Sequence, residues 1–97
     1  MAVYVDCARI PYGRMNMSHM IADSTEELLS MVDSIGVQRK WIQYSGTPKE
    51  HFDICDAKRE RALALGALPI TWREYANKIS ERRLARAELS TLEEEKE

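Results

Sequence analysis

One segment of the chain, residues 24–36, carries the full set of signals for a helix with one buried face. Ser24 and Glu27 have the spacing of a capping box, which satisfies backbone N–H groups at a helix start. Gly36 supplies the left-handed residue that ends many helices. Apolar residues recur between them at helical spacing: Leu28, Met31, Val32 and Ile35. Such a helix must pack against another layer, which the rest of the chain has to supply.

Short runs of β-branched and aromatic residues alternate with helical segments along the remaining chain. The expected strands are residues 2–5, 40–44 and 68–70, the last at a sheet edge because it contains a proline. The stretch 15–22, with three methionines, fits a strand or a packed connection equally well. The other expected helices are residues 54–65, preceded by Asp53, and a helix that follows the capping box of Thr71 and Glu74.

Alternating strands and helices are typical of a small α/β layer structure, and right-handed crossovers would make most of its sheet parallel. We therefore expect a single α/β domain over residues 1–80, with a short, mostly parallel sheet of three to four strands and about three helices. Beyond Ser80 the apolar stripe gives way to charged residues. Residues 81–97 are expected to form a charged helix or a frayed tail.

Composition and charge argue against several classes of protein. The net charge of −2 provides no general attraction for nucleic acid or an anionic membrane. No apolar run approaches the length of a membrane span, and the first residues do not resemble a signal peptide, so a cytoplasmic protein is expected. Cys7 and Cys55 lack the spacing of a zinc knuckle, and reduced thiols are the expected state.

Both histidines precede an aspartate closely, as His19 precedes Asp23 and His51 precedes Asp53. Asp6 ends the first apolar run. Open α/β sheets bind ligands at the carboxyl ends of their strands, which is where Asp6, Asp23, Tyr44 and Thr71 are expected to lie. Imidazole and carboxylate are ligands for divalent metals, and His19, His51 and Asp6 are the predicted metal ligands.

These residues also have ordinary structural explanations. Asp23 and Asp53 fit helix caps, each contributing about 1 kcal/mol. Lys58 falls within the apolar stripe of its predicted helix. Its ammonium group must therefore reach water, form a salt bridge with Asp6 or Asp23, or bind an anionic ligand. Arg14, in the first loop, would strengthen a site for phosphate.

Other kinds of site have weaker support. Tyr12, Trp41 and Tyr44 could stack on a base, but they do not form a recognised RNA-binding motif, so a nucleic-acid partner is disfavoured. The chain has no nucleophile elbow and no glycine-rich phosphate loop.

Several ordered segments together resemble a known family: Tyr4 to Asp6, Ser18 to Asp23, His51 to Arg59 and Ile70 to Glu74. The chain resembles domain of unknown function 4031, a small uncharacterised family of bacteria and their phages. The likeness covers residues 2 to about 75. It implies a compact intracellular domain and a phage or prophage origin, and it brings no established activity or cofactor.

Three functional hypotheses follow. The leading one is a small accessory protein with a pocket for an anionic, nucleotide-like ligand, formed by Asp6, Arg14, His19, Asp23, His51, Asp53 and Lys58. The second is a phosphoesterase or nuclease that depends on a divalent metal bound by the same acids and histidines. The third is a protein-interaction module or homodimer that uses the helix from Trp72. Whether any reaction is catalysed is left open.

Overall fold

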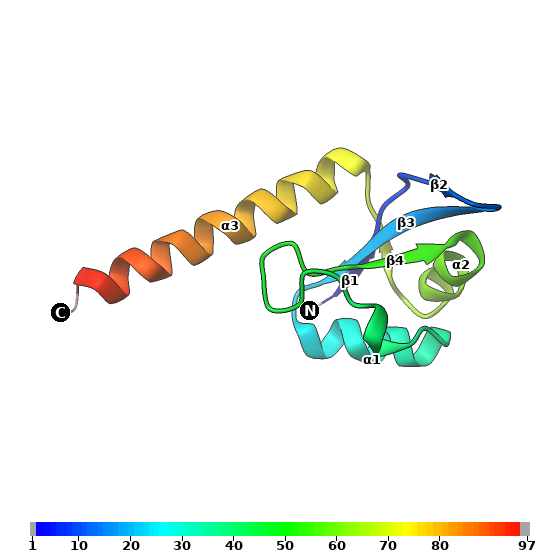
Figure 1. Ribbon diagram of the computed structural model, residues 1–97, viewed down its shortest axis with the longest axis horizontal. Helices are drawn as coiled ribbons and strands as arrows, with labels where there is room; N and C mark the ends of the chain where they lie inside the picture. Colours follow the sequence, from blue (N-terminus) through cyan, green and yellow to red (C-terminus); the bar gives the residue numbers. More distant parts are fainter. Residues whose placement is uncertain (1, 96–97) are drawn as a thin grey trace.

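A five-stranded mixed sheet forms the centre of the structure, with two helices on one face and a long third helix that extends away from it (Figure 1). The computed structural model describes the backbone of residues 2–95 and the side chains of residues 2–89. The elements in chain order are β1 (Val3–Val5), β2 (Ile10–Tyr12), β3 (Met15–Ala22), α1 (Thr25–Ile35), η1 (Arg39–Trp41), β4 (Phe52–Cys55), α2 (Asp56–Ala64), β5 (Leu68–Pro69) and α3 (Trp72–Glu95).

The central strand of the sheet is β3, which occupies the stretch that the sequence left ambiguous. It pairs antiparallel with β1, β2 and β4, and within the described residues the parallel pairing is that of β1 with β5. The expectation of a mostly parallel sheet was therefore wrong. One reason for the antiparallel pairing is the turn Gly13–Arg14, where Gly13 has a φ of 61°. This turn reverses the chain directly from β2 into β3 as a hairpin, without a helical crossover.

The first predicted helix is confirmed as α1. Ser24 accepts a hydrogen bond from the backbone N–H of Glu27 at 3.2 Å, and its hydroxyl donates to the Glu27 carboxylate at 3.0 Å. Gly36 ends the helix with a φ of 81°. Leu28, Val32 and Ile35 are buried, as their spacing predicted, so α1 covers the core with one face.

The strand predicted at residues 40–44 is absent. Residues 39–41 form the short 3₁₀ helix η1, and Gln43 makes an isolated antiparallel bridge with His51. Trp41 is 62% exposed. Aromatic residues favour strands because they pack well on a half-buried pleated surface. This segment has no long strand to pair with, because β4 already pairs with that edge of β3.

The second helix begins later than predicted, because residues 52–55 form β4. Phe52 and Ile54 are buried, whereas Asp53 and Cys55 between them are half-buried and point to the opposite face. This two-residue alternation is the signature of a strand, and it was masked by the alanine-rich and leucine-rich segment that follows. Asp53 is therefore a strand residue and not a helix cap. Helix α2 then ends close to the predicted position.

The two faces of the sheet have different roles. One face packs on α1 and α2 and forms the hydrophobic core, whose buried members include Val5, Met20, Phe52, Leu28, Val32 and Ala62. The opposite face carries Asp6, His19 and Asp53, because side chains alternate along each strand. The core therefore fixes the positions of the polar residues on the other side of the same strands.

The first turns of helix α3 lie over the polar face, and the rest of the helix projects away from the sheet. Its predicted capping box is confirmed, since the backbone N–H of Glu74 donates to the Thr71 hydroxyl at 3.0 Å and the Thr71 N–H donates to Glu74 at 3.1 Å. The helix continues to Glu95, so the charged segment that begins at residue 81 is helical as far as the structure describes it. None of the described helices is long and apolar enough to cross a membrane.

Candidate metal centre

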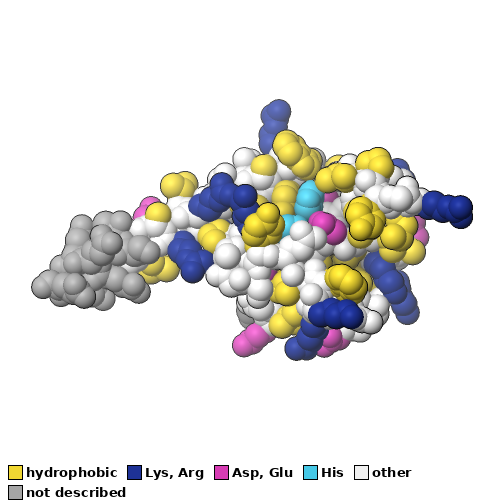
Figure 2. Space-filling view, in the orientation of Figure 1, with side chains coloured by type: hydrophobic (Ala, Val, Ile, Leu, Met, Phe, Trp, Pro, Cys, Tyr) yellow, Lys and Arg dark blue, Asp and Glu magenta, His cyan; other side chains and the backbone are white. Residues whose placement is uncertain are grey.

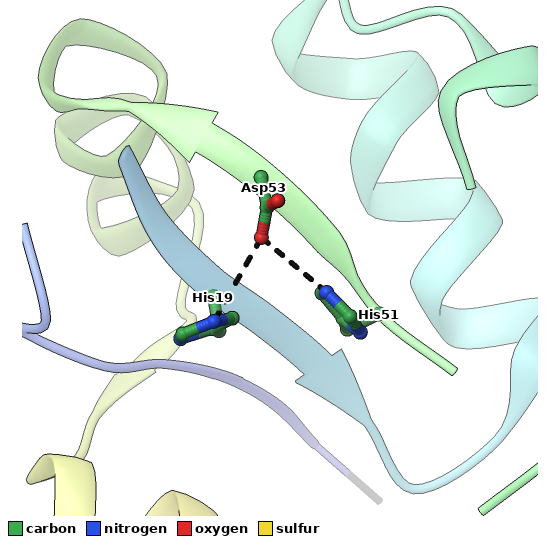
Figure 3. Close-up of side chains that lie close together, drawn as sticks. All are labelled: His19, His51 and Asp53. Atoms are coloured by element: carbon green, nitrogen blue, oxygen red, sulfur yellow. Dashed lines mark ion pairs between the residues drawn. The ribbon is translucent and has the colours of Figure 1, made fainter. Parts of the chain in front are cut away.

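The pairing of β3 with β4 brings the polar residues together. His19 and Asp53 are direct cross-strand partners, and their neighbours Ser18 and Ile54 form the next pair, on the core side. His51 lies two residues before Asp53, so its side chain points to the same face. The three side chains converge above the two strands (Figure 3).

His19 is held from behind by Asp6. The Asp6 side chain is fully buried, and its Oδ2 lies 2.6 Å from Nδ1 of His19. Its Oδ1 accepts hydrogen bonds from the backbone N–H groups of His19, at 2.8 Å, and Ala8, at 3.2 Å. An ionised carboxylate only accepts, so Nδ1 of His19 carries the hydrogen. In the neutral ring Nε2 then has the lone pair.

Hydrogen bonds keep Asp6 ionised despite its burial. Burial alone would raise the pKa of this carboxyl. The His19 ring and the backbone N–H groups of His19 and Ala8 more than offset that effect, so the pKa of Asp6 lies below its usual value. Arg59 adds a further link, since its Nε donates to the Asp6 backbone carbonyl at 2.8 Å.

His51 is oriented in the same way by a backbone group. Its Nδ1 lies 2.6 Å from the carbonyl oxygen of Lys49, which can only accept, so Nδ1 is again the donor. Its Nε2 lies 3.4 Å from Oδ1 of Asp53. Burial alone would lower the pKa of His51, but the Asp53 carboxylate and the Lys49 carbonyl together raise it above the ordinary value.

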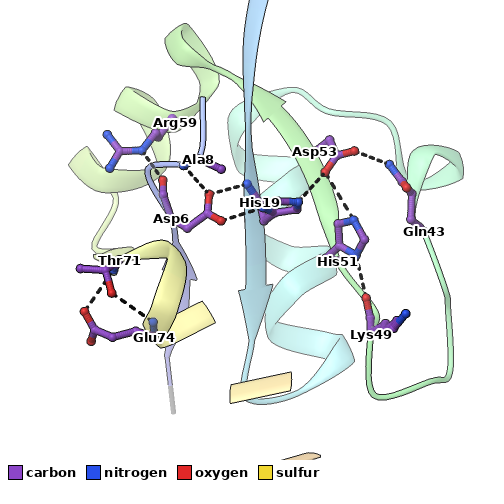
Figure 4. A network of polar contacts seen from close by, with 10 residues as sticks. All are labelled: Asp6, Ala8, His19, Gln43, Lys49, His51, Asp53, Arg59, Thr71 and Glu74. Carbon is purple, nitrogen blue, oxygen red and sulfur yellow. Dashed lines mark hydrogen bonds and ion pairs between the residues drawn. The ribbon is translucent and has the colours of Figure 1, made fainter. Parts of the chain in front are cut away.

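Asp53 completes the group with one of its two oxygens. Oδ2 accepts a hydrogen bond from Nε2 of Gln43 at 2.6 Å, and Oδ1 lies 3.9 Å from Nε2 of His19 (Figure 4). The hydrogen bond with His51 holds the pKa of Asp53 below its usual value, although partial burial opposes this effect. Gln43 thus occupies one oxygen and leaves the other directed at the two imidazoles.

The geometry matches a three-ligand metal site. One ligand atom each from His19, His51 and Asp53 lies within 4.8 Å of the other two. A first-row metal holds its nitrogen and oxygen ligands at roughly 2.0–2.2 Å, so small inward movements would suffice to bind one. The same residues can instead form a proton-sharing network, in which a protonated His51 pairs with Asp53. The Asp53 side chain is 34% exposed, so the group opens to solvent.

Tyr75 of α3 is a member of the site that the sequence did not reveal. Its ring stacks on His19 with centroids 4.5 Å apart and 11° between the planes. Burial raises the pKa of Tyr75 to about 12, and the charges of Asp6 and Asp53 add to the effect. In the sequence, its helical spacing with Trp72, Ala76 and Ile79 indicates only an apolar stripe. Gln43 and the Lys49 carbonyl were also missed, because no local pattern points to them.

Four of the predicted site residues come together and three do not. Asp6, His19, His51 and Asp53 form the group above. The sequence named Asp6 as the third metal ligand, whereas in the structure it is Asp53 whose Oδ1 faces Nε2 of both histidines. The other three lie elsewhere: Arg14 in the turn between β2 and β3, Asp23 at the far end of β3, and Lys58 on α2.

Asp23 and Lys58 both have structural roles. Asp23 accepts hydrogen bonds from the Ala2 N–H at 2.8 Å and from the Tyr4 hydroxyl at 3.3 Å, which ties it to the start of β1. Nζ of Lys58 lies beside Gly36, 3.1 Å from where a Cβ would stand. This places the ammonium at the carboxyl end of α1, where the helix dipole favours a positive charge.

Comparison with known proteins identifies a family and no characterised relative. Neither curated proteins nor solved structures gave a match. A family described as "Protein of unknown function (DUF4031)" matches residues 3–82, a span that contains every residue of the candidate metal centre. The chain therefore belongs to the DUF4031 family.

Proposed function

We propose that this protein binds a divalent transition metal, such as Zn²⁺ or Mn²⁺, through Nε2 of His19, Nε2 of His51 and one oxygen of Asp53. The observation that carries the proposal is the arrangement behind the two imidazoles. Each Nδ1 donates to a fixed acceptor, Asp6 or the Lys49 carbonyl, which leaves each Nε2 as the ring nitrogen that faces Oδ1 of Asp53. Supporting contacts of this kind accompany most metal-bound histidines.

Three protein ligands leave coordination positions open, which is typical of catalytic metal sites and not of closed structural ones. A bound ion would lower the pKa of a coordinated water to about 7 and so supply a nucleophile at neutral pH. The function that fits best is therefore metal-dependent hydrolysis, with a phosphate ester as the substrate class. The exposed side of Asp53 supports access for such a substrate.

The placement of the cationic residues favours this proposal over an anion held by lysine and arginine. Lys58 lies beside Gly36, and Arg14 lies in the hairpin turn, so neither stands beside the two histidines. An anionic ligand at this centre would rely chiefly on a metal for its positive charge. One bound metal would therefore serve both proposed roles, the binding of an anionic ligand and the hydrolysis of a phosphate ester.

Titration calorimetry with Zn²⁺ and Mn²⁺ tests the metal directly. We expect one ion per chain, and we expect His19→Ala, His51→Ala and Asp53→Ala each to weaken binding by more than the roughly 10- to 100-fold typical of a lost supporting residue. Asp33→Asn is the matched control, because this exposed carboxylate pairs with Arg39 away from the centre.

Hydrolysis is measured on a chromogenic phosphodiester with and without a chelator. The proposal predicts turnover that needs the metal and that disappears in His19→Ala. Wild-type protein that binds neither ion would overturn the proposal and leave the polar network as a structural feature. Binding without turnover would retain the metal site and reject the hydrolytic role.

A further inference from the structure

An open groove of about 470 Å³ begins at the candidate metal centre. Its walls come from the β2–β3 hairpin on one side and from the segment around η1 on the other, with Gln43 and Asp53 at one end. The apolar lining consists of Tyr12, Met15, Met17, Val37 and Trp41. Asp53 therefore belongs both to the metal centre and to the groove, which makes the two continuous.

The groove gathers large apolar side chains that would ordinarily be covered. Tyr12 is 72% exposed, Trp41 62% and Met15 47%. Figure 2 shows hydrophobic side chains around the histidine surface and the acidic side chain next to it. Contiguous exposed apolar surface on a soluble domain commonly marks a binding site, and the groove volume falls within the range of small-molecule sites.

The wall that carries Trp41 is fixed by hydrogen bonds. Gln43 and His51 exchange two backbone hydrogen bonds, at 2.9 and 3.1 Å, which attach the segment to the start of β4. The N–H of Trp41 donates to the Gln38 carbonyl at 3.1 Å and closes the turn of η1. The aromatic ring is thus presented by a defined backbone that is itself tied to a metal-ligand residue.

The charges of the groove determine what it can accept. Asp53 is the one charged residue in the described lining, and a bound metal would neutralise it. The rest of the lining is apolar, apart from the Gln43 amide. Gln43 uses one N–H on Asp53 and retains an acceptor oxygen and a second N–H. A neutral, planar group with hydrogen-bonding edges fits these properties.

We propose that the aromatic groove binds the base of a nucleoside phosphate whose phosphate group binds the metal at His19, His51 and Asp53. This inference rests on the proposed function and names its substrate class. Trp41 and Tyr12 supply ring faces for stacking, and every base has a π face that such rings can contact. Met15 and Met17 supply adaptable thioether contacts, and Gln43 supplies polar contacts to the edge of the base.

The test compares adenosine monophosphate with ribose phosphate, which lacks the base, by calorimetry on Mn²⁺-loaded protein. The nucleotide is expected to bind roughly tenfold more tightly than ribose phosphate, because stacking of one base on an aromatic side chain strengthens binding by about this factor or more. Trp41→Ala and Tyr12→Ala should each reduce that preference, while Mn²⁺ binding and ribose phosphate binding stay unchanged. Trp72→Ala is the matched control, because this tryptophan is 60% exposed and does not line the groove.

The outcomes separate the groove from the metal centre. Both proposals are supported if His19→Ala loses binding of adenosine monophosphate and of ribose phosphate, while Trp41→Ala and Tyr12→Ala lose only the preference for the base. Equal binding of the two ligands by metal-loaded wild type overturns the groove proposal and leaves the metal centre intact. Failure of the wild type to bind Mn²⁺ overturns both. A parallel titration with a short single-stranded oligonucleotide shows whether the nucleoside phosphate is a free nucleotide or a strand end.

Discussion

Asp6 is buried completely and receives three hydrogen bonds, one from the His19 ring and two from backbone N–H groups. Asp6 directly follows β1, and its backbone N–H donates to the His19 carbonyl at 3.0 Å, so it is part of the fold as well as part of the site. A carboxylate in this position can only accept a hydrogen, and this property selects the tautomer of His19. Asp6 therefore selects Nε2 as the ring nitrogen that His19 would offer to the proposed metal, although Asp6 is not itself a proposed ligand.

We expect Asp6→Asn to weaken metal binding by roughly 10- to 100-fold. An asparagine amide turned with its NH₂ toward His19 would donate to Nδ1, which moves the ring hydrogen to Nε2 and removes the lone pair that a metal needs. Calorimetry with Zn²⁺ measures the effect. Asp56→Asn serves as the control, since this exposed carboxylate pairs with Arg9. Unchanged affinity in Asp6→Asn would contradict the role assigned to the tautomer.

The sequence grouped Asp6, His19, His51 and Asp53 in one candidate site because such side chains lie at the expected junctions between elements, and the structure does bring these four together. It assigned Asp53 to the start of a helix, since an aspartate before an alanine-rich segment fits a cap equally well. Tyr75 could not be recognised, because stacking on His19 depends on how α3 crosses the sheet. Contacts made by tertiary packing leave no local pattern to read.

Helix α1 shows which elements a sequence specifies well. Its capping residue, apolar stripe and terminal glycine are local, and all are found in the structure. Strand β4 is the opposite case, because Phe52 and Ile54 become buried strand residues only through the pairing of β4 with β3. The hairpin from β2 to β3 was missed for a similar reason: Arg14 was placed in a loop, but the segment that follows fitted a strand or a packed connection equally well.

Two leucines on different helices test how the elements share the core. Leu28 of α1 is 1% exposed, whereas Leu84 of α3 is 65% exposed. Leu28→Ala should lower the free energy of unfolding by about 2–5 kcal/mol, because it removes packed apolar surface and leaves a cavity. Leu84→Ala should change it by no more than about 0.5 kcal/mol. Urea denaturation measures both, and equal effects would mean that α3 is covered in solution.

At the scale of the whole molecule, α3 gives the structure its elongated shape, with extents of 51 × 25 × 23 Å. The first turns of α3 contact the polar face through Tyr75, stacked on His19, and through Lys78, whose Nζ lies 3.9 Å from the centre of the Tyr4 ring. The family match ends at residue 82, before the helix ends. Pairing of this helix in a homodimer stays a prediction, which sedimentation analysis would test.

The proton of Tyr75 contributes to the stability of the whole domain. Its pKa is about 12 in the folded protein, above the ordinary value of 10.0, so the folded state holds the proton more tightly. The resulting stabilisation is complete below about pH 10 and is lost as the pH rises toward about 12. Urea denaturation of wild type and Tyr75→Phe across this range should show a steeper loss in the wild type. Parallel slopes would contradict the assignment.

The order of the site residues along the chain has a consequence for biosynthesis. His19 leaves the ribosome well before His51 and Asp53, and Tyr75 follows later still. The proposed ligand set is incomplete until β4 has been synthesised and has paired with β3. Metal would therefore be acquired by a nearly finished domain, and a nascent chain that stalls before residue 53 would have no complete site with which to take up the ion.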